Sequence, residues 1–473
     1  MGAIGSAGSL TLYFHCRASL SPKLTNYRLV IYKACILLAG LSSFGFPRVS
    51  TINEASFVIL LSALAAITIF AFLSQLVAYW RMYAYVDKEL RREHDRFCPK
   101  VAVVLPCKGL DPGFADNIGK LFEQEYFKPG DKRIPNFEIV FAVACKTDPA
   151  YQSLREAMSN YPNVPSRLVV AGKNSQRAQK INNQLHALKQ ISSDAEIFVF
   201  VDSDVIARRD FISYLVAPLK DENVGIATGY RFYIPFRGDW PSLLRALWNR
   251  LTAWELASKD FAFAWGGAMA ISRANFLKAR IEEVWDKAAD DDLSMTTAVK
   301  KLGLKVLFVP QCLVASNGDA SLAEVLEWMN RQLVLTKVYY PALWRKAIVR
   351  AGILAIWLVA VIVSAYQGIV QHDQPFQLAF CLGLSLLLLE ILFLLQAQGL
   401  WRRVLFYQVE QDSKAANIDR AYDRSFWRSI CVLPLAHFLL PWMTLNSLFT
   451  NRIQWRGITY ELRSPEETVV VRS

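Results

Sequence analysis

Two aspartates stand one residue apart, directly after an apolar run, in the stretch "EIFVFVDSDV". Residues 197–201 favour a buried strand, so Asp202 and Asp204 are expected where that strand ends. Neighbouring carboxylates repel each other unless a cation lies between them, and Mg²⁺ or Mn²⁺ binds oxygen ligands and bridges to phosphates. The alternative is a polar turn in which Asp204 caps a following helix. The position after a buried strand makes a metal site as good an interpretation as a turn.

Three further aspartates, Asp290, Asp291 and Asp292, precede a stretch in which apolar residues recur at helical spacing. One acid is enough to cap a helix and complement its dipole, so three exceed that need. One of them could act as a general base that takes a proton from an attacking hydroxyl. Upstream, Gly266 and Gly267 predict a tight turn before a strand, where the backbone can approach a ligand closely.

The elements that position these residues lie between residues 99 and 340. Strand-like runs within 100–110, which ends in a Pro/Gly loop, and at 137–145, 166–172 and 196–202 alternate with helical stretches. Such alternation predicts a mainly parallel sheet with right-handed crossovers, and parallel sheets bind ligands at the carboxyl ends of their strands. Asp202 and Asp204 fall at such an end.

Together these motifs resemble the inverting glycosyltransferases of family 2 type with a GT-A fold, and in particular the ceramide glucosyltransferase branch. The segments that carry the resemblance are "PCKGLDPGFADNIGKLFEQEY", "CKTDPAY", "SRLVVAGKNSQRAQKINNQL", the acidic pair before its helix, and "QWRGITYEL" near the end of the chain. The likeness extends from about residue 101 to 341 and includes the C-terminal segment. It implies a Rossmann-like catalytic domain that uses a UDP-sugar and a divalent cation.

The resemblance also implies roles for individual residues. Asp292, preceded by Asp291, takes the place of the general base, and Asp202 and Asp204 contact the metal and the diphosphate. The residues implied at the nucleotide-sugar are Lys108, Gly109, Asp148, Lys180, Asn182, Asn183 and Asp202. Those implied at the acceptor or the diphosphate are Gly266, Gly267, Arg331, Lys337 and Arg456. An ordinary helix start remains an alternative interpretation of "KINN".

The sequence departs from the family pattern at two places. Cys145 to Thr147 stand where the family has an aspartate that contacts the uracil ring, so Asp148 is the only acid nearby. In the family's (Q/R)-x-x-R-W motif, Arg331 keeps the first position, but Val334 and Leu335 replace Arg and Trp. Lys337 or Arg456 could substitute for the lost arginine.

The apolar residues are concentrated in stretches at 55–80, 351–370 and 376–400, each long enough to span a bilayer. Weaker candidates lie at 29–46 and 429–449. Basic residues follow the first and third strong stretches, which predicts a catalytic domain that faces the cytoplasm. The formal net charge of +12 is therefore explained by the membrane rather than by nucleic acid. Eight cysteines without a C-x-x-C pair exclude a zinc-ribbon site and favour reduced thiols.

These observations predict four regions: an N-terminal anchor of one or two helices at 1–98, a catalytic domain at 99–345, membrane helices at 346–450 and a cytoplasmic tail at 451–473. Pro434 and Pro441 make residues 429–449 a re-entrant or interfacial segment in this prediction. Arg245 and Arg250 alternate with aromatic residues, which suits either a helix at the membrane surface or ordinary core packing.

The favoured interpretation is a membrane-bound enzyme that moves a hexose, glucose by resemblance, from a UDP-sugar to a lipid hydroxyl. Two alternatives stay open. A processive polysaccharide synthase shares the catalytic core but usually has more spans and an intact R-W motif. A catalytically silent membrane protein that binds a nucleotide-sugar would explain the departures at Cys145 and Val334.

Overall fold

The computed structural model describes residues 54–92, 97–372, 374–409 and 415–472. A seven-stranded sheet with the order β5-β4-β1-β6-β8-β7-β9 forms the centre of the catalytic domain. Its strands are β1 (Val101–Pro106), β4 (Phe137–Val143), β5 (Ser166–Val170), β6 (Ile197–Val201), β7 (Val224–Ile234), β8 (Ala268–Ser272) and β9 (Lys305–Asn317). Only β8 runs antiparallel to its neighbours in this sheet. The predicted mainly parallel α/β fold is confirmed.

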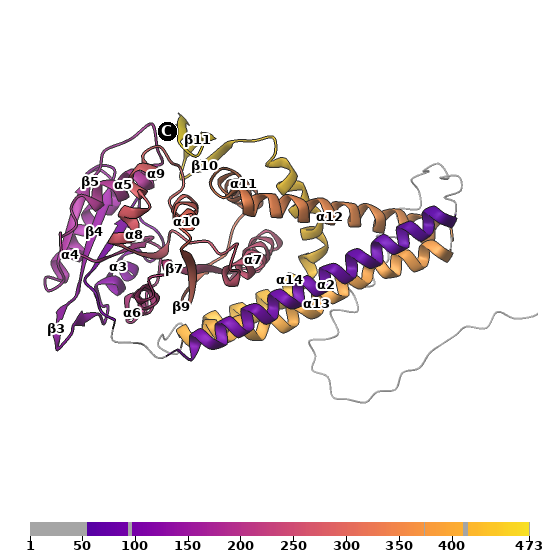
Figure 1. Ribbon diagram of the computed structural model, residues 1–473, viewed down its shortest axis with the longest axis horizontal. Helices are drawn as coiled ribbons and strands as arrows, with labels where there is room; N and C mark the ends of the chain where they lie inside the picture. Colours follow the sequence, from indigo (N-terminus) through magenta and orange to yellow (C-terminus); the bar gives the residue numbers. More distant parts are fainter. Residues whose placement is uncertain (1–53, 93–96, 373, 410–414, 473) are drawn as a thin grey trace, which may run out of the picture.

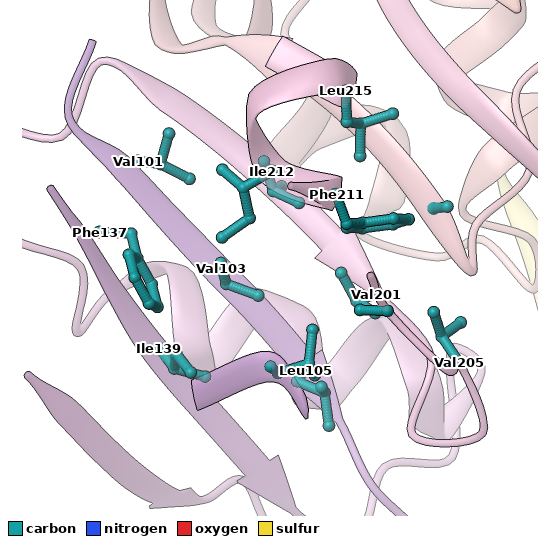
Figure 2. Close-up of a cluster of buried hydrophobic side chains, with 14 of the residues drawn as sticks. Val101, Val103, Leu105, Phe137, Ile139, Val201, Val205, Phe211, Ile212 and Leu215 are labelled. Atoms are coloured by element: carbon teal, nitrogen blue, oxygen red, sulfur yellow. The ribbon is translucent and has the colours of Figure 1, made fainter. Parts of the chain in front are cut away.

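Helices cover both faces of the sheet, so the central strands are buried on both sides. Figure 2 shows Val101, Val103 and Leu105 of β1 directed toward Ile212 and Leu215, while Ala102 and Val104 belong to the core on the opposite face. The helices of this domain are α3 (Phe114–Phe122), α4 (Pro149–Asn160), α5 (Gln179–Leu188), α6 (Phe211–Val216), α7 (Trp240–Ala253), α8 (Arg273–Lys278), α9 (Ile281–Trp285), α10 (Asp292–Lys301) and α11 (Leu322–Tyr339). A short hairpin, β2 (Phe127–Lys128) with β3 (Asp131–Pro135), extends from one edge.

Long helices extend from one side of the catalytic domain (Figure 1). They are α2 (Glu54–Leu90), α12 (Pro341–Ala365, continued by a π-helical turn at Tyr366–Val370), α13 (Gln374–Val409) and α14 (Ala415–Asn446). Four helices in the described ranges are long and apolar enough to cross a membrane, at 62–90, 341–370, 374–405 and 417–446. The weaker candidate at 29–46 lies outside the described residues.

Helix α14 is continuous in spite of Pro434 and Pro441, and its contacts define an unusual path. Near its start, Asp419 pairs with Arg402 at the catalytic-domain end of α13. In its middle, His437 lies 2.7 Å from Glu390 of α13, and its ring packs against Trp357 of α12. Just after its end, Ser447 accepts a hydrogen bond from Trp344 at the start of α12. Both ends of α14 therefore contact the catalytic-domain ends of α13 and α12, and the re-entrant or interfacial course expected for residues 429–449 stays a prediction.

The C-terminal residues are ordered against the catalytic domain. Strands β10 (Arg452–Trp455), β11 (Ile458–Ser464) and β12 (Glu467–Arg472) form an antiparallel sheet. Ile453, Tyr460 and Leu462 are buried in the same core as α5, α10 and α11. The segment predicted as a tail is thus packed against α5, α10 and α11 of the catalytic domain.

Candidate active site

The predicted aspartates come together around one lysine. Lys180, at the start of α5, lies with its Nζ 3.0 Å from Asp202 Oδ1 and 2.9 Å from Asp291 Oδ2. Asp202 follows β6, and its backbone N–H donates to the carbonyl of Gly267 beside β8. Because β6 and β8 are neighbours in the sheet, these contacts join the carboxyl end of β6 to the loop before α10.

A second cation holds the other side of the Asp202–Asp204 pair. Arg231 of β7 forms a bidentate ion pair with Asp204, with both N–O distances 2.6 Å, and its Nη2 lies 3.3 Å from Asp202 Oδ2. The guanidinium also lies over the ring of Trp265, 5.0 Å from its centroid. Sequence analysis did not identify Arg231. The available signal was a single arginine inside the otherwise uncharged strand "VGIATGYRFYI", since a charge buried in a sheet needs a partner.

The electrostatics of Asp202 follow from these two cations. Burial alone would raise the pKa of Asp202, but the charges of Lys180 and Arg231 outweigh it and hold that pKa below its usual value. Burial opposes the charge on Lys180 as well, yet Asp202 and Asp291 raise its pKa above the ordinary value. Asp202 and the two cations that hold it, Lys180 and Arg231, therefore stay ionised together.

The acidic run before α10 has a different environment. Gly266 N–H donates to Asp292 Oδ2 over 2.6 Å, Leu293 N–H donates to Asp290 Oδ2 over 2.9 Å, and Gln184 donates to Asp291 over 2.8 Å. Burial and the neighbouring charge of Asp291 raise the pKa of Asp292 to about 6, with Lys180 opposing. Burial and the charges of Asp292 and Asp291 raise the pKa of Asp290 well above its ordinary value. Asp292 is the least buried of the three.

Gly266 and Gly267 lie between the two acidic groups, as predicted for a close approach. A Cβ at Gly266 would lie 2.7 Å from Asp291 Oδ2 and 2.8 Å from Lys180 Nζ. At Gly267 it would lie 2.2 Å from the ring of Trp265. A side chain at Gly266 would therefore displace Lys180 or Asp291, and a side chain at Gly267 would displace Trp265.

A second set of predicted residues surrounds the end of β1. Asp148 caps α4 and also accepts a hydrogen bond from Gly109 N–H over 2.9 Å. Lys108 and Arg456 each donate to the other's backbone carbonyl, and Arg456 pairs with Asp111 over 2.8 Å. The C-terminal sheet is thereby fixed to the loop that the resemblance places at the nucleotide.

Other predicted residues make contacts that do not include the acids. Asn182 and Asn183 are buried, and their amides donate to the carbonyls of Ala171, Gly172, Cys107 and Ala142 at strand ends. Lys337 donates to Ser447 and Thr450 beyond α14, and Arg331 lies over the ring of Trp455. Their ligand roles remain predictions, and the described contacts of Asn182, Asn183 and Lys337 are structural.

The donors at Asp202 and Asp204 fit a hard divalent cation by their chemistry. All four oxygens belong to carboxylates, and each accepts one contact from Lys180 or Arg231. A carboxylate oxygen has a second lone pair, so these contacts do not exhaust the coordinating capacity of the pair. The carboxylates of Asp290, Asp291 and Asp292 form a further all-oxygen group, with ligand atoms within 4.8 Å of one another.

Comparison with known proteins gives one family match over most of the chain and several partial relatives. The profile of glycosyl transferase family 21 matches residues 60–468. A ceramide glucosyltransferase from Gibberella zeae is 27% identical over 143 residues, which cover 28% of this chain and 26% of that protein. Ceramide glucosyltransferase 1 from Caenorhabditis elegans is 25% identical over 137 residues, 28% of this chain and 27% of that protein. The chain thus spans about a quarter of the length of these curated relatives.

Among solved structures, a mannosyltransferase from Pyrobaculum calidifontis in complex with GDP-mannose and Mn²⁺ is 17% identical, with a TM-score of 0.42, and the match covers 82% of this chain and 99% of that one. The family profile covers most of the chain, and the ceramide glucosyltransferases found confirm the resemblance expected from the motifs. This chain belongs to glycosyl transferase family 21, a family of glycosyltransferases.

Proposed function

We propose that this chain transfers a hexose from a UDP-sugar to a hydroxyl of a membrane lipid, with inversion at the anomeric carbon. One observation supports the proposal above the others. Lys180 pairs with Asp202 at the end of β6 and with Asp291, which precedes Asp292. One lysine therefore connects the pair that would bind the diphosphate, Asp202 and Asp204, to the acidic run that contains the base. The family membership and the ceramide glucosyltransferases among its relatives support the substrate class.

Asp292 has the properties of the general base. Its pKa of about 6 leaves it mostly ionised at neutral pH while keeping it a better proton acceptor than an ordinary aspartate. Its carboxylate takes the proton of the lipid hydroxyl as that oxygen attacks the anomeric carbon. The bond from that carbon to the diphosphate oxygen breaks, and UDP leaves with the electron pair. Gly266 N–H fixes the orientation of the carboxylate during this step.

Asp202 and Asp204 would hold the divalent cation. When bound, the cation neutralises the charge that develops on the leaving diphosphate. Lys180 pairs with Asp202 and Arg231 pairs with both aspartates, so these cations hold the two carboxylates in position for that purpose. Positioning the donor and a lipid hydroxyl together at the membrane supplies much of the rate advantage.

The orientation of the chain is part of the proposal. Basic segments follow α2 and α13, and the contacts of α14 return the C-terminal sheet to the catalytic domain. We infer that the catalytic domain and the C-terminal sheet both face the cytoplasm. In sealed right-side-out vesicles a C-terminal tag should resist added protease, whereas cleavage of the tag without detergent would contradict this orientation.

The proposed transfer is tested with membranes that contain the full chain and UDP-hexose labelled in the sugar. We expect label in the organic extract as one sugar per lipid, and none with membranes that contain Asp202→Asn. Asp286→Asn changes an aspartate whose side chain is 57% exposed and pairs with Arg177, outside both acidic groups, and is the matched control. Label in a polymer would indicate a polysaccharide synthase. Binding of UDP-sugar without any labelled product would indicate a silent binding protein.

A further inference from the structure

The turn formed by Gly266 and Gly267 contacts both acidic groups of the candidate active site. Gly266 N–H donates to Asp292 Oδ2 over 2.6 Å, and the carbonyl of Gly266 accepts a hydrogen bond from Lys180 Nζ over 3.3 Å. The carbonyl of Gly267 accepts a hydrogen bond from the backbone N–H of Asp202 over 3.2 Å. The position of this glycine turn therefore sets where the proposed base lies relative to Lys180 and Asp202.

Trp265, which precedes the glycine turn, contacts the same two parts of the site with its ring. The guanidinium of Arg231 lies over that ring, 5.0 Å from its centroid, and Arg231 also holds Asp204. A Cβ at Gly267 would lie only 2.2 Å from the ring, so the ring packs directly on the turn. A shift of the turn would therefore disturb the support of Arg231 as well.

Two buried threonines hold the residues that lead into the glycine turn. Ala264 N–H donates to Thr296 Oγ1, and Trp265 N–H donates to Thr228 Oγ1, each over 2.9 Å. Both threonines are 0% exposed, so neither is placed to touch a substrate. Together with Gly266 N–H, three consecutive backbone donors each bind a side chain that lies outside the loop.

The two threonines belong to the elements that carry the site. Thr296 follows Asp292 by four residues on α10, so both side chains lie on one face of the helix, and that face holds the loop at two points. Thr228 lies on β7, and its hydroxyl proton is directed at the carbonyls of Gly229 and Ala268. This orientation leaves the lone pairs of the Thr228 oxygen free to accept the hydrogen bond from the loop.

The glycines make these anchors important. Glycine loses more conformational freedom on ordering than any other residue, so the course of two successive glycines has to be fixed by their neighbours. Valine is close to threonine in shape, but it offers no acceptor to a backbone N–H. The hydroxyl oxygens of Thr228 and Thr296, rather than their bulk, are therefore the feature that fixes the turn.

We propose that Thr228 and Thr296 are positioning residues for sugar transfer, which hold the glycine turn so that Gly266 N–H keeps Asp292 aimed at the acceptor hydroxyl. This inference rests on the proposed function and adds to it two residues from outside the sequence motifs. Neither threonine contacts the donor or the acceptor, so their effect passes through the backbone of the loop.

The test compares valine and serine at each position, in membranes that contain the full chain and labelled UDP-hexose. Thr296→Val removes the acceptor of Ala264 N–H, and kcat should fall about tenfold to a hundredfold, as for a small misplacement of a reacting group. Thr228→Val should lower kcat in the same way. Thr296→Ser and Thr228→Ser keep the oxygen and should restore most of the turnover.

Titration with UDP separates positioning from a general loss of the site. Asp202 and Asp204 keep their ion pairs with Lys180 and Arg231 in these variants, so the affinity for UDP should change far less than kcat. An equal loss of UDP affinity and kcat would show that the whole site has been disturbed and would overturn the proposal. Serine variants as slow as the valine variants would overturn it too.

Thr297→Val is the matched control. Thr297 is the next residue on α10, and its hydroxyl donates to the carbonyl of Tyr339 over 2.6 Å instead of binding the loop. Thr297→Val therefore removes one hydrogen bond of the same helix and should leave kcat near that of the unaltered chain. An equal loss of kcat in Thr296→Val and Thr297→Val would assign both residues to the stability of α10 and contradict the proposal.

Hydrogen–deuterium exchange of the purified full chain in detergent gives a readout that does not depend on turnover. The amides of residues 264–266 should exchange about tenfold faster in Thr296→Val than in the unaltered chain, because an anchor of the loop has been lost, and Thr297→Val should leave them unchanged. Unchanged exchange in both valine variants of the anchors would overturn the proposal. A chain that shows this difference in exchange but transfers no sugar would refute the proposed function and keep the threonines as anchors of the turn. A chain that transfers sugar equally well with and without the two hydroxyls would do the reverse.

Discussion

The two acidic groups on either side of Lys180 use the same residue type in opposite ways. Asp202 and Asp204 face two cations, with every carboxylate oxygen in contact with Lys180 or Arg231. Asp290, Asp291 and Asp292 are adjacent in the chain, repel one another, and have Lys180 as their one close cation within the described ranges. The pKa of Asp202 lies below its usual value, whereas burial raises that of Asp292 to about 6.

This difference indicates a division of labour. Carboxylates that stay ionised suit a cation and a diphosphate, while a carboxylate with a raised pKa suits proton transfer. Lys180 belongs to both groups, so it sets the charge balance between them. Variants that alter one group and leave the other intact test whether this division holds.

The largest effect is expected from Asp292→Asn. The amide cannot accept the proton of the lipid hydroxyl, so sugar transfer should fall by about 10²–10⁴-fold. The proposed function assigns donor binding to Asp202 and Asp204, so the affinity for UDP should change far less than turnover, and any change would report the coupling through Lys180. Turnover with labelled UDP-hexose and titration with UDP measure the two quantities. Near-normal turnover would remove Asp292 as the base, and Asp286→Asn serves as the control.

Lys180→Met breaks the connection between the groups. It leaves Asp202 and Asp291 buried without the cation that they share, and removal of one partner from a buried ion pair destabilises a protein by about 3–5 kcal/mol. We expect a clearly lower melting temperature in detergent and loss of UDP binding. Lys278→Met removes an exposed lysine and should change neither. An unchanged melting temperature would show that the two acidic groups are independent.

The sequence predicted the strands and loops that carry these aspartates because each motif is local. The apolar run before Asp202, the paired glycines and the acidic run before α10 each occupy a few consecutive residues, and the structure places them together. Arg231 could not be found in this way, since its partner Asp204 is 27 residues away in the sequence and becomes adjacent only through the pairing of β8 with β6 and β7.

The roles of "KINN" show the same limit. A sequence pattern cannot state whether an amide side chain faces a ligand or a strand end. Asn182 and Asn183 are buried and bind backbone carbonyls, while Lys180 in the same motif reaches the acids. The interpretation as an ordinary helix start therefore fits the contacts of the two asparagines. The interpretation as part of the site fits the position of the lysine.

Gly266→Ala places a methyl group between the two acidic groups. Its Cβ would lie 2.7 Å from Asp291 Oδ2 and 2.8 Å from Lys180 Nζ, so the ammonium or the carboxylate must move. Overpacking of this kind is unfavourable by about 1–3 kcal/mol, which corresponds to roughly a tenfold to hundredfold loss of turnover if it falls on the reactive geometry. Gly352→Ala adds a methyl group to open space on α12 and should be neutral. Equal turnover of both variants would indicate that Lys180 tolerates displacement.

The smallest expected effect is a shift in the pH dependence of turnover. It tests the repulsion between Asp291 and Asp292. Turnover should rise with pH through about 6, because Asp292 must be deprotonated to act as a base. Burial raises the pKa of Asp292 and the like charge of Asp291 raises it further; Asp291→Asn removes that charge, while burial and the opposing charge of Lys180 remain. The pKa of Asp292 should then fall, and the acidic limb of the kcat profile should move to lower pH. Asp286→Asn should leave the limb in place. A limb that moves to higher pH, or does not move, would show that burial rather than Asp291 sets the basicity of Asp292.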